Sequence, residues 1–393
     1  MNRKLKIAIY SGEIPSTTFI ERLIEGLSTK GCVIVLFGIL KKKVSYKTKG
    51  VIVKGYRQNR ICKAFHLLYY TVLLTVFRIE EKRQLDSILK AEGRLSMYDR
   101  VKCYPVLWYK PDIFHIQWAK GVSEWVWVKE FGTKLVLSLR GAHINYSPVA
   151  DQNLADMYDT YFSKVDAFHA VSKAIATEAG KYNASHEKIK VVYSGLDLNT
   201  MSSSESAIPK KGKTFKLISI GRPHWIKGYV YALDACKFLK DNDFDFKYTI
   251  VGGKNDIELA YQIHDLGLED DIELSENISF SEVIDVIRKS DLLLLPSLEE
   301  GLANVVLEAM ALQKLVLSTN CGGMPEIIKD GLNGFLVPIR KPKAMAEKII
   351  EISNLTETQK NTITNEAFKT IQSGHTTGHM MNGMLELYQK VLK

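Results

Sequence analysis

The stretch PSLEEGLANVVLEAMALQKLVLSTNCGGMPEIIKDGLNGFLVP (296–338) decides the fold of this chain. It begins at the end of the apolar run DLLLLPS (291–297), turns at LEEGL, and continues with an apolar spacing that predicts a helix starting near Ala303. A second apolar run, KLVLST (314–319), follows this helix. Strand, helix and strand in this order are the repeating unit of a parallel sheet covered by helices.

The same alternation runs through the rest of the chain. The predicted strands are nearly continuous in apolar character, as expected where helices cover both faces of a sheet. They lie at 6–10, 32–38, 50–54, 112–118, 134–140, 167–171, 189–194, 215–221, 246–253, 271–275, 291–297, 314–319 and 334–338. We therefore predict an α/β protein with two doubly wound, Rossmann-like domains that face a central cleft.

The length of the chain also indicates two domains, because 393 residues exceed what one hydrophobic core supports. The polar, serine-rich segment NTMSSSESAIPKKGK (199–213) is the best candidate for a linker. The predicted domains are 1–198 and 214–374. The segment 375–393 is predicted to form a final helix that packs back on the N-terminal domain, and another helix is predicted near 342–354.

Composition is that of a globular protein, with 46% apolar and 25% charged residues. The five cysteines are odd in number and scattered, which favours a reduced, cytoplasmic chain. No Cys/His cluster has metal-ligand spacing. The apolar run near the N-terminus is too short for a signal sequence, and no run reaches the roughly 20 apolar residues of a membrane span.

Positive charge is unevenly distributed. The net charge is +9, and Lys41–Lys63 contains nine Lys or Arg residues and no Asp or Glu. The mostly apolar run AFHLLYYTVLLTVF (64–77) follows directly. A basic patch beside an apolar helix favours an anionic membrane surface, with peripheral binding to the inner face of the plasma membrane. The alternative is a solvated basic loop followed by a core helix. The run carries no recognised nucleic-acid-binding motif, so nucleic acid is not an expected partner.

Two carboxylates, Glu300 and Glu308, lie eight residues apart across the start of the helix predicted at Ala303. The first N–H groups of a helix lack internal partners and form an anion site suited to phosphate. Gly301 allows close approach of the backbone to a ligand. Carboxylates accept hydrogen bonds from hydroxyl groups, so the set indicates a phosphate flanked by sugars, as in a nucleotide-sugar. The alternative is that Glu300 caps the helix and Glu308 lies on the surface.

A second segment adds cations to the same end of the same sheet. In SIGRPHWIKGYVYALDAC (219–236), Arg222 and Lys227 follow the first strand of the C-terminal domain. Both can reach the same diphosphate, Arg through a forked contact and Lys as a point charge. The alternative is that both are solvated loop residues.

These motifs resemble glycosyltransferase family 4, whose members have the GT-B fold. The resemblance rests on the Glu-x7-Glu element, on GRPHWIKG (221–228), on CGGMPEIIKDGLNGFLVP (321–338), and on the shorter segments VVYSGLD (191–197) and AVSK (170–173). It covers the chain from about Leu5 to Pro338 and is loose in the first 150 residues. The segment IPSTTFIERLIEGLSTKG (14–31) resembles the opening of bacterial exopolysaccharide and surface-glycan transferases.

The resemblance implies a retaining transferase that moves a sugar from a nucleotide-diphosphate sugar to a glycan or lipid-linked acceptor during surface polysaccharide assembly. Arg222 and Lys227 would stabilise the departing diphosphate, Glu308 would bind the ribose, and Glu300 would position the donor sugar together with backbone N–H groups. The other donor-binding positions that the family implies are Gly12 in the first βα loop, Gly221, Gly301, Leu302 and Ala303.

One departure concerns the strand at 134–140. Many family members carry His-Gly after it, and this chain has Arg140 and Gly141, so Arg140 takes the donor-site position. A second His of the family is replaced by Gln117. The family uses UDP- or GDP-sugars and needs no metal or other cofactor, and its acceptors include polyprenyl-linked glycans.

Two other functions fit the same pattern. A nucleotide-sugar epimerase of the same fold would act on a free sugar nucleotide without an acceptor. A non-catalytic, nucleotide-sugar-binding partner protein would bind the donor only. The four charged residues at 222, 227, 300 and 308 together favour the transferase.

Overall fold

The computed structural model describes residues 4–202 and 214–393. The chain divides into two compact units, which we call unit 1 (Met1–Val192 with Thr377–Lys393) and unit 2 (Tyr193–Thr376). The predicted borders lay a few residues away, at 198 and 374. Residues 199–202 of the predicted linker belong to a short helix, α9 (Leu198–Ser202), because Asp197 accepts bonds from Asn199 N and Thr200 Oγ1 at 3.0 and 2.8 Å. The rest of the predicted linker, 203–213, lies outside the described residues.

Unit 1 is built on a seven-stranded parallel sheet in the order β3-β2-β1-β4-β5-β6-β7. Each strand coincides with a predicted apolar run, so these predictions are confirmed. The strands are β1 (Lys6–Ile14), β2 (Val33–Leu40), β3 (Val51–Val53), β4 (Ile113–Ile116), β5 (Lys134–Leu139), β6 (Ala167–Ala170) and β7 (Ile189–Val191).

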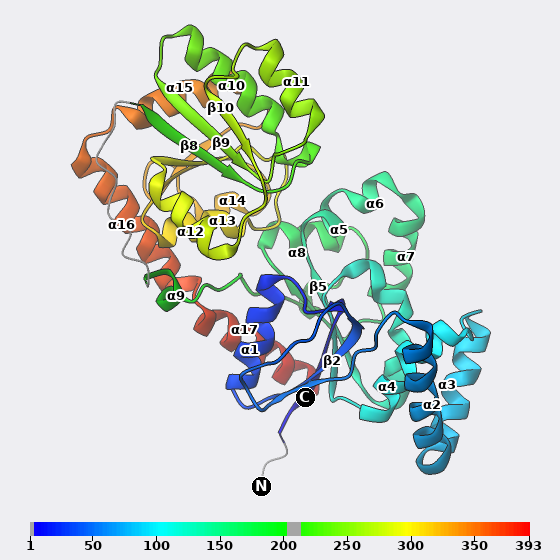
Figure 1. The fold of residues 1–393 in the computed structure, drawn as a ribbon. Coiled ribbons are helices and arrows are strands. Elements are labelled where there is room, and N and C mark those ends of the chain that lie inside the picture. The colour runs from blue at the N-terminus through cyan, green and yellow to red at the C-terminus, as the bar shows by residue number, and fades with distance from the viewer. Residues whose placement is uncertain (1–3, 203–213) are drawn as a thin grey trace. The chain divides into compact units, whose positions relative to one another are not determined.

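Helices cover both faces of this sheet (Figure 1). One face carries α1 and α17, which pack so closely that a Cβ on Gly26 would lie 2.4 Å from Met381 Sδ. The other face carries most of the remaining helices. The helices of unit 1 are α1 (Thr18–Thr29), α2 (Arg60–Phe77), α3 (Ile79–Ala91), α4 (Met97–Tyr109), α5 (Gly141–Asn145), α6 (Ser147–Ala150), α7 (Gln152–Phe162), α8 (Lys173–Gly180) and α17 (Thr377–Leu392), with short 3-10 turns at Ala119–Glu124, Val126–Phe131 and His186–Lys188.

Unit 2 is built on a six-stranded parallel sheet in the order β10-β9-β8-β11-β12-β13. All six strands were predicted, and their positions are confirmed. They are β8 (Phe215–Ile220), β9 (Phe246–Val251), β10 (Ile272–Ser275), β11 (Leu292–Leu295), β12 (Leu315–Thr319) and β13 (Phe335–Val337).

Two helical layers enclose the unit 2 sheet. Helices α10, α11 and α15 share one core with it, and α12, α13, α14 and α16 share the other. Their bounds are α10 (Tyr229–Asp241), α11 (Ile257–Asp265), α12 (Phe280–Lys289), α13 (Asn304–Ala311), α14 (Met324–Ile327), α15 (Pro342–Ser353) and α16 (Glu357–Gly374), with a 3-10 turn, η4, at Trp225–Lys227. The sequence predicted α15 and α17 but not α16, whose buried stripe is narrow.

Both sheets have the strand order of a doubly wound fold, which confirms the predicted α/β class. In such a sheet the order reverses beside the first strand, and ligands bind at the carboxyl ends of the strands at this switch point. The switch point lies between β8 and β11 in unit 2 and between β1 and β4 in unit 1.

Candidate functional site

The switch point of unit 2 carries the two predicted motifs on adjacent strands. Strand β8 ends at Ile220 and continues into the loop of Gly221 to Gly228, and β11 ends at Leu295 and continues into the loop that precedes α13. The two loops touch, since Leu298 N donates to Ile226 O at 2.7 Å. The two motifs therefore form one surface, although Lys227 and Glu300 are 73 residues apart in sequence.

Gly228 shows why this contact needs a glycine. Its φ is +63°, and a Cβ there would lie 2.1 Å from the carbonyl oxygen of Pro296. A side chain at this position would therefore be strained by its backbone conformation and would also push the two loops apart. The glycine keeps the neighbouring Lys227 next to the loop after β11.

Lys227 and Glu300 form an ion pair in this surface. Lys227 Nζ lies 2.6 Å from Glu300 Oε1, with 25% and 13% of the two side chains exposed. Ser297 Oγ donates to the same carboxylate oxygen at 2.8 Å. A Cβ on Gly221 would lie 3.6 Å from Lys227 Cε, so the lysine side chain passes over a position without a side chain. An ammonium group has three donors, so Lys227 retains capacity for an anion beside Glu300.

The segment after Glu300 leads into the open start of α13. Gly323 N donates to Glu300 O at 3.1 Å, and a Cβ on Gly322 would lie 1.8 Å from that oxygen. Helix α13 begins at Asn304, as predicted to within one residue, and its N-cap Ala303 provides no capping side chain. The first N–H groups of α13 are therefore available to an anion next to Lys227.

The other charged residues of the prediction differ in their surroundings. Glu308 lies on α13 and is 8% exposed, so it is not the surface residue of the alternative interpretation. Arg222 is exposed on the loop after β8. Of the four charged residues, Lys227 and Glu300 are in direct contact. Arg222 belongs to the same loop as Lys227 and precedes it by five residues. Gly301, Leu302 and Ala303 connect Glu300 to α13.

Arg140 follows β5 in unit 1 and has no carboxylate partner among the described residues. Its Nη2 donates to Gln117 Oε1 at 3.0 Å, and its guanidinium carbon lies 4.5 Å from the centre of the Phe19 ring. Burial lowers the pKa of Arg140 to about 9, so the group remains cationic at neutral pH. Its Nε has no hydrogen-bond partner within the described parts of the chain. Such a cation is suited to an anionic or hydroxyl-bearing ligand.

Gly12 occupies a different place from the one predicted. The prediction put it in the first βα loop, but it lies within β1, where the pairing with β2 breaks register between Tyr10 and Glu13. Its φ is +86°, and a Cβ on Gly38 would lie 2.7 Å from Gly12 O. The strand continues beyond the bulge because Glu13 and Ile14 resume pairing with β2.

Behind Arg140 lies a buried polar network that the sequence interpretation missed. Ser138 Oγ lies 2.9 Å from both His115 Nε2 and His169 Nδ1, and His115 Nδ1 lies 2.7 Å from Tyr388 Oη on α17. His169 Nε2 lies 2.9 Å from Val192 O. The signal was present as one polar residue inside the apolar part of each of three strand sequences, the His of IFHI, the Ser of KLVLSL and the His of AFHA.

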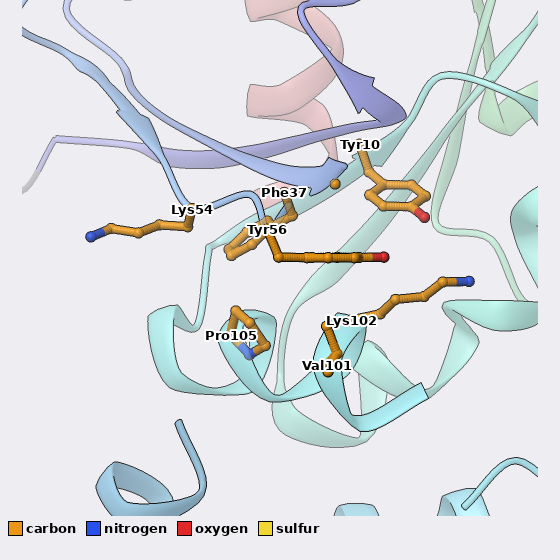
Figure 2. Close-up of a pocket in the computed structure, with 8 residues that line it drawn as sticks. Tyr10, Phe37, Lys54, Tyr56, Val101, Lys102 and Pro105 are labelled. Atoms are coloured by element: carbon orange, nitrogen blue, oxygen red, sulfur yellow. The ribbon is translucent and has the colours of Figure 1, made fainter. Parts of the chain in front are cut away.

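Unit 1 also contains a small pocket near the ends of its first strands, shown in Figure 2. The hydroxyl groups of Tyr10 and Tyr56 and the amine of Lys102 lie on one side of it in the figure. Lys102 is paired with Glu124 at 2.9 Å. The lining residues are Tyr10, Phe37, Gly38, Lys54, Tyr56, Val101, Lys102 and Pro105. No sequence motif indicated this pocket, because its members come from four separate segments.

Comparisons with known proteins agree with this architecture. A solved structure of Anabaena Alr3699/HepE in complex with UDP-glucose matches 98% of this chain and 100% of that chain, with a TM-score of 0.74 and 18% sequence identity. Sucrose-phosphate synthase from Thermosynechococcus elongatus matches 99% of both chains, with a TM-score of 0.74 and 13% identity. The class defined by the fold is therefore GT-B, as predicted.

Sequence comparisons narrow the class to a family. The family model described as "Glycosyl transferases group 1" matches residues 202–367. The chain is 31% identical over 205 residues to the putative colanic acid biosynthesis glycosyltransferase WcaL of Salmonella typhimurium, covering 50% of each protein. It is 27% identical over 228 residues to the amylovoran biosynthesis glycosyltransferase AmsK of Erwinia amylovora, covering 56% of this chain and 55% of that protein. The chain thus spans about half the length of these relatives. Residues 202–367 match the group 1 glycosyltransferase model, and this match supports the family resemblance found in the sequence.

Proposed function

We propose that the chain is a glycosyltransferase that moves a sugar from a nucleotide-diphosphate sugar to a glycan or polyprenyl-linked acceptor, with retention of anomeric configuration, in exopolysaccharide assembly. The observation that carries this proposal is the Lys227–Glu300 pair at the switch point of unit 2, beside the uncapped start of α13. The biosynthetic roles named for the colanic acid and amylovoran relatives support the class of product. We propose a cytoplasmic location, where nucleotide-sugars are available.

In this proposal the diphosphate of the donor lies against the loop of Gly221 to Gly228. Lys227 and the first N–H groups of α13 bind its oxygens, and Arg222 reaches them from the exposed loop. These donors stabilise negative charge as it grows on the departing diphosphate. This stabilisation is the main contribution to the rate of transfer. Glu300 accepts hydrogen bonds from the donor sugar, and Glu308 binds the ribose.

The positive charge of Arg222 and Lys227 supplies what a bound metal supplies in other transferases. We therefore propose that transfer needs no metal or other cofactor. Among the described residues, no group of three or more His, Cys, Asp or Glu side chains is arranged to hold a metal ion. The measurement is the rate of nucleotide release before and after addition of EDTA, and a rate restored only by a divalent cation would contradict the proposal.

The test of the donor site is a thermal-shift panel of UDP- and GDP-sugars on wild type, Lys227→Ala and Lys348→Ala. Lys348 is a matched control, because its ion pair with Glu351 on α15 has the same 2.6 Å distance. A donor should raise the Tm of wild type and Lys348→Ala by mass action and should not raise that of Lys227→Ala. Equal Tm shifts in all three proteins would show that Lys227 does not bind the donor.

The same samples separate the alternative functions. A transferase releases UDP or GDP in the presence of acceptor, and the NMR coupling of the product's anomeric proton reports retention. An epimerase would convert the free donor without acceptor. A binding protein would show the thermal shift and no turnover with any acceptor fraction.

We propose that the acceptor binds at the pocket of Figure 2, since tyrosine hydroxyls and ammonium groups bind sugars and phosphates well. Tyr56→Phe keeps the ring and removes one hydroxyl. It should raise the KM for acceptor and leave the Kd for donor unchanged. A change confined to the donor would refute the assignment.

A further inference from the structure

Helix α2 presents an apolar face to the outside of unit 1. It begins at Arg60, after Asn59 accepts a bond from Ile61 N at 2.8 Å, and lies at the edge of unit 1 beside α3 and α4 (Figure 1). Seven large apolar side chains on it are between 52% and 69% exposed, namely Ile61, Phe65, Leu68, Tyr69, Val72, Val76 and Phe77. An exposed patch of this kind marks an interaction surface.

The exposed side chains follow helical spacing. Five of them stand at i, i+4, i+7, i+11 and i+15, so they share one face over about 22 Å of helix axis. These five are Ile61, Phe65, Leu68, Val72 and Val76. The opposite side of α2 is packed, with Tyr70 and Leu74 buried in the core of unit 1. No charged side chain occurs between Lys63 and Arg78.

Cations gather at the N-terminal end of this face. Arg57 and Arg60 lie in the turn before α2 and in its first turn, whereas Lys63 of the same turn is half-buried, with its ammonium 5.5 Å from the centre of the Tyr98 ring. Lys41 begins a run of three lysines nearby, because Leu40 N donates to Tyr56 O at 2.9 Å and so holds the end of β2 beside the approach to α2. One of the three is paired, Lys41 with Glu13 at 2.9 Å.

The acids beyond the C-terminal end of α2 are paired with bases. Glu80 contacts Arg83 at 3.0 Å, and Glu81 contacts Lys110 at 2.6 Å. They therefore add little net negative charge near the apolar face. The charge around α2 is complementary to an anionic surface.

We propose that α2 binds an anionic phospholipid bilayer, with its apolar face in the interfacial layer and its N-terminal cations against the headgroups. By length and composition α2 is also the one helix among the described residues that could cross a membrane. It lies on the surface instead, because its other side is packed on unit 1 through the buried Tyr70 and Leu74.

The exposed face of α2 belongs to the same part of unit 1 as the pocket proposed for the acceptor. Helix α2 packs on α4 through the shared core, and α4 lines the pocket of Figure 2 with Val101, Lys102 and Pro105. Membrane binding by α2 would bring that pocket close to lipid-linked molecules. The binding itself does not rest on the proposed function, and its test needs no sugar donor.

The first experiment is flotation of the full chain with phosphatidylcholine vesicles, with and without phosphatidylglycerol. The test variant is Phe65→Glu combined with Val72→Glu, and the control is Val149→Glu, which changes a residue of unit 1 that is 75% exposed. Wild type and control should bind the anionic vesicles, and the double variant should bind at least tenfold less. Loss of each headgroup-facing base should weaken binding about fivefold. Equal binding by the double variant, or equal binding of wild type to neutral and anionic vesicles, would overturn the proposal.

Cys62 provides an independent reporter on α2 itself. It is exposed, whereas the other four cysteines are buried, and burial raises the pKa of Cys103 and Cys321 to about 12. A polarity-sensitive maleimide should therefore label Cys62 selectively. Its emission should shift to the blue on addition of anionic vesicles. A shift that arises without lipid and tracks a dimer in light scattering would overturn the proposal in favour of a second copy of the chain on this face.

Discussion

Acidification should destabilise the chain through four neutral histidines of unit 1, of which His115 and His169 are buried and His66 and His143 are half-buried. Burial, aided by nearby cations, lowers the pKa of His66 and His143 to about 4 and that of His169 to about 3. The same causes hold the pKa of His115 well below its ordinary 6.5. The unfolded chain binds protons at these positions below about pH 6.5 while the folded chain does not, so stability is full above that pH and falls towards pH 4.

The magnitude follows from proton linkage. Between about pH 7.5 and pH 5.5 each such histidine removes ~1.4 kcal/mol from the free energy of unfolding. The two in the buried network, His115 and His169, together account for about 2.8 kcal/mol, and all four for about 5.6 kcal/mol. Against a total stability of about 5–15 kcal/mol, this is a large fraction.

The assay is urea unfolding followed by tryptophan fluorescence at a series of pH values. Four of the five tryptophans lie in unit 1, so the signal reports mainly on that unit. His66→Phe is a suitable variant, because the ring lies between the rings of Tyr56 and Tyr70 and a phenyl group preserves these contacts. It should reduce the pH dependence by about a quarter. A wild-type change of less than about 1 kcal/mol over this range would refute the reasoning.

Three substitutions test other parts of the structure. Gly228→Ala should lower affinity for the sugar nucleotide at least tenfold in calorimetry, because its Cβ would meet Pro296 O at 2.1 Å. Gly267→Ala has a similar φ of +64° but open space around it, so it should lose about 1 kcal/mol of stability and keep its affinity; equal affinity losses in both variants would contradict the steric argument. Tyr388→Phe removes the hydroxyl beside His115 and should lower stability by about 1 kcal/mol in urea unfolding, whereas an unchanged midpoint would show that this bond contributes nothing.

The strands could be predicted because parallel strands buried on both faces are short, nearly continuous apolar runs. Helix α16 was missed for the opposite reason. Its sequence is polar, and its burial rests mainly on Ile363, Ala367 and Ile371 along a narrow stripe. The start of α16 could have been recognised from the sequence, because Thr356 and Gln359 form a capping box there.

Only part of the candidate site could be predicted from the sequence. Lys227 and Glu300 could be placed together because each follows a strand, and adjacent strands bring their ends to one edge of the sheet. Gly12 was misplaced because a bulge lets β1 continue past it. Gln117 and Arg140 follow the neighbouring strands β4 and β5, but strand prediction does not establish which side chains meet beyond the strand ends.

Because unit 1 is completed by α17, which follows unit 2 in the chain, the ribosome must synthesise both unit 2 and α17 before unit 1 can close. Until then α1 packs on the sheet without α17, and a nascent chain must keep the apolar surface that α17 later covers from aggregating while unit 2 emerges from the ribosome. A ribosome that stalls before Met381 would release a product whose second half can fold and whose first half presents an unfinished interface to chaperones and proteases.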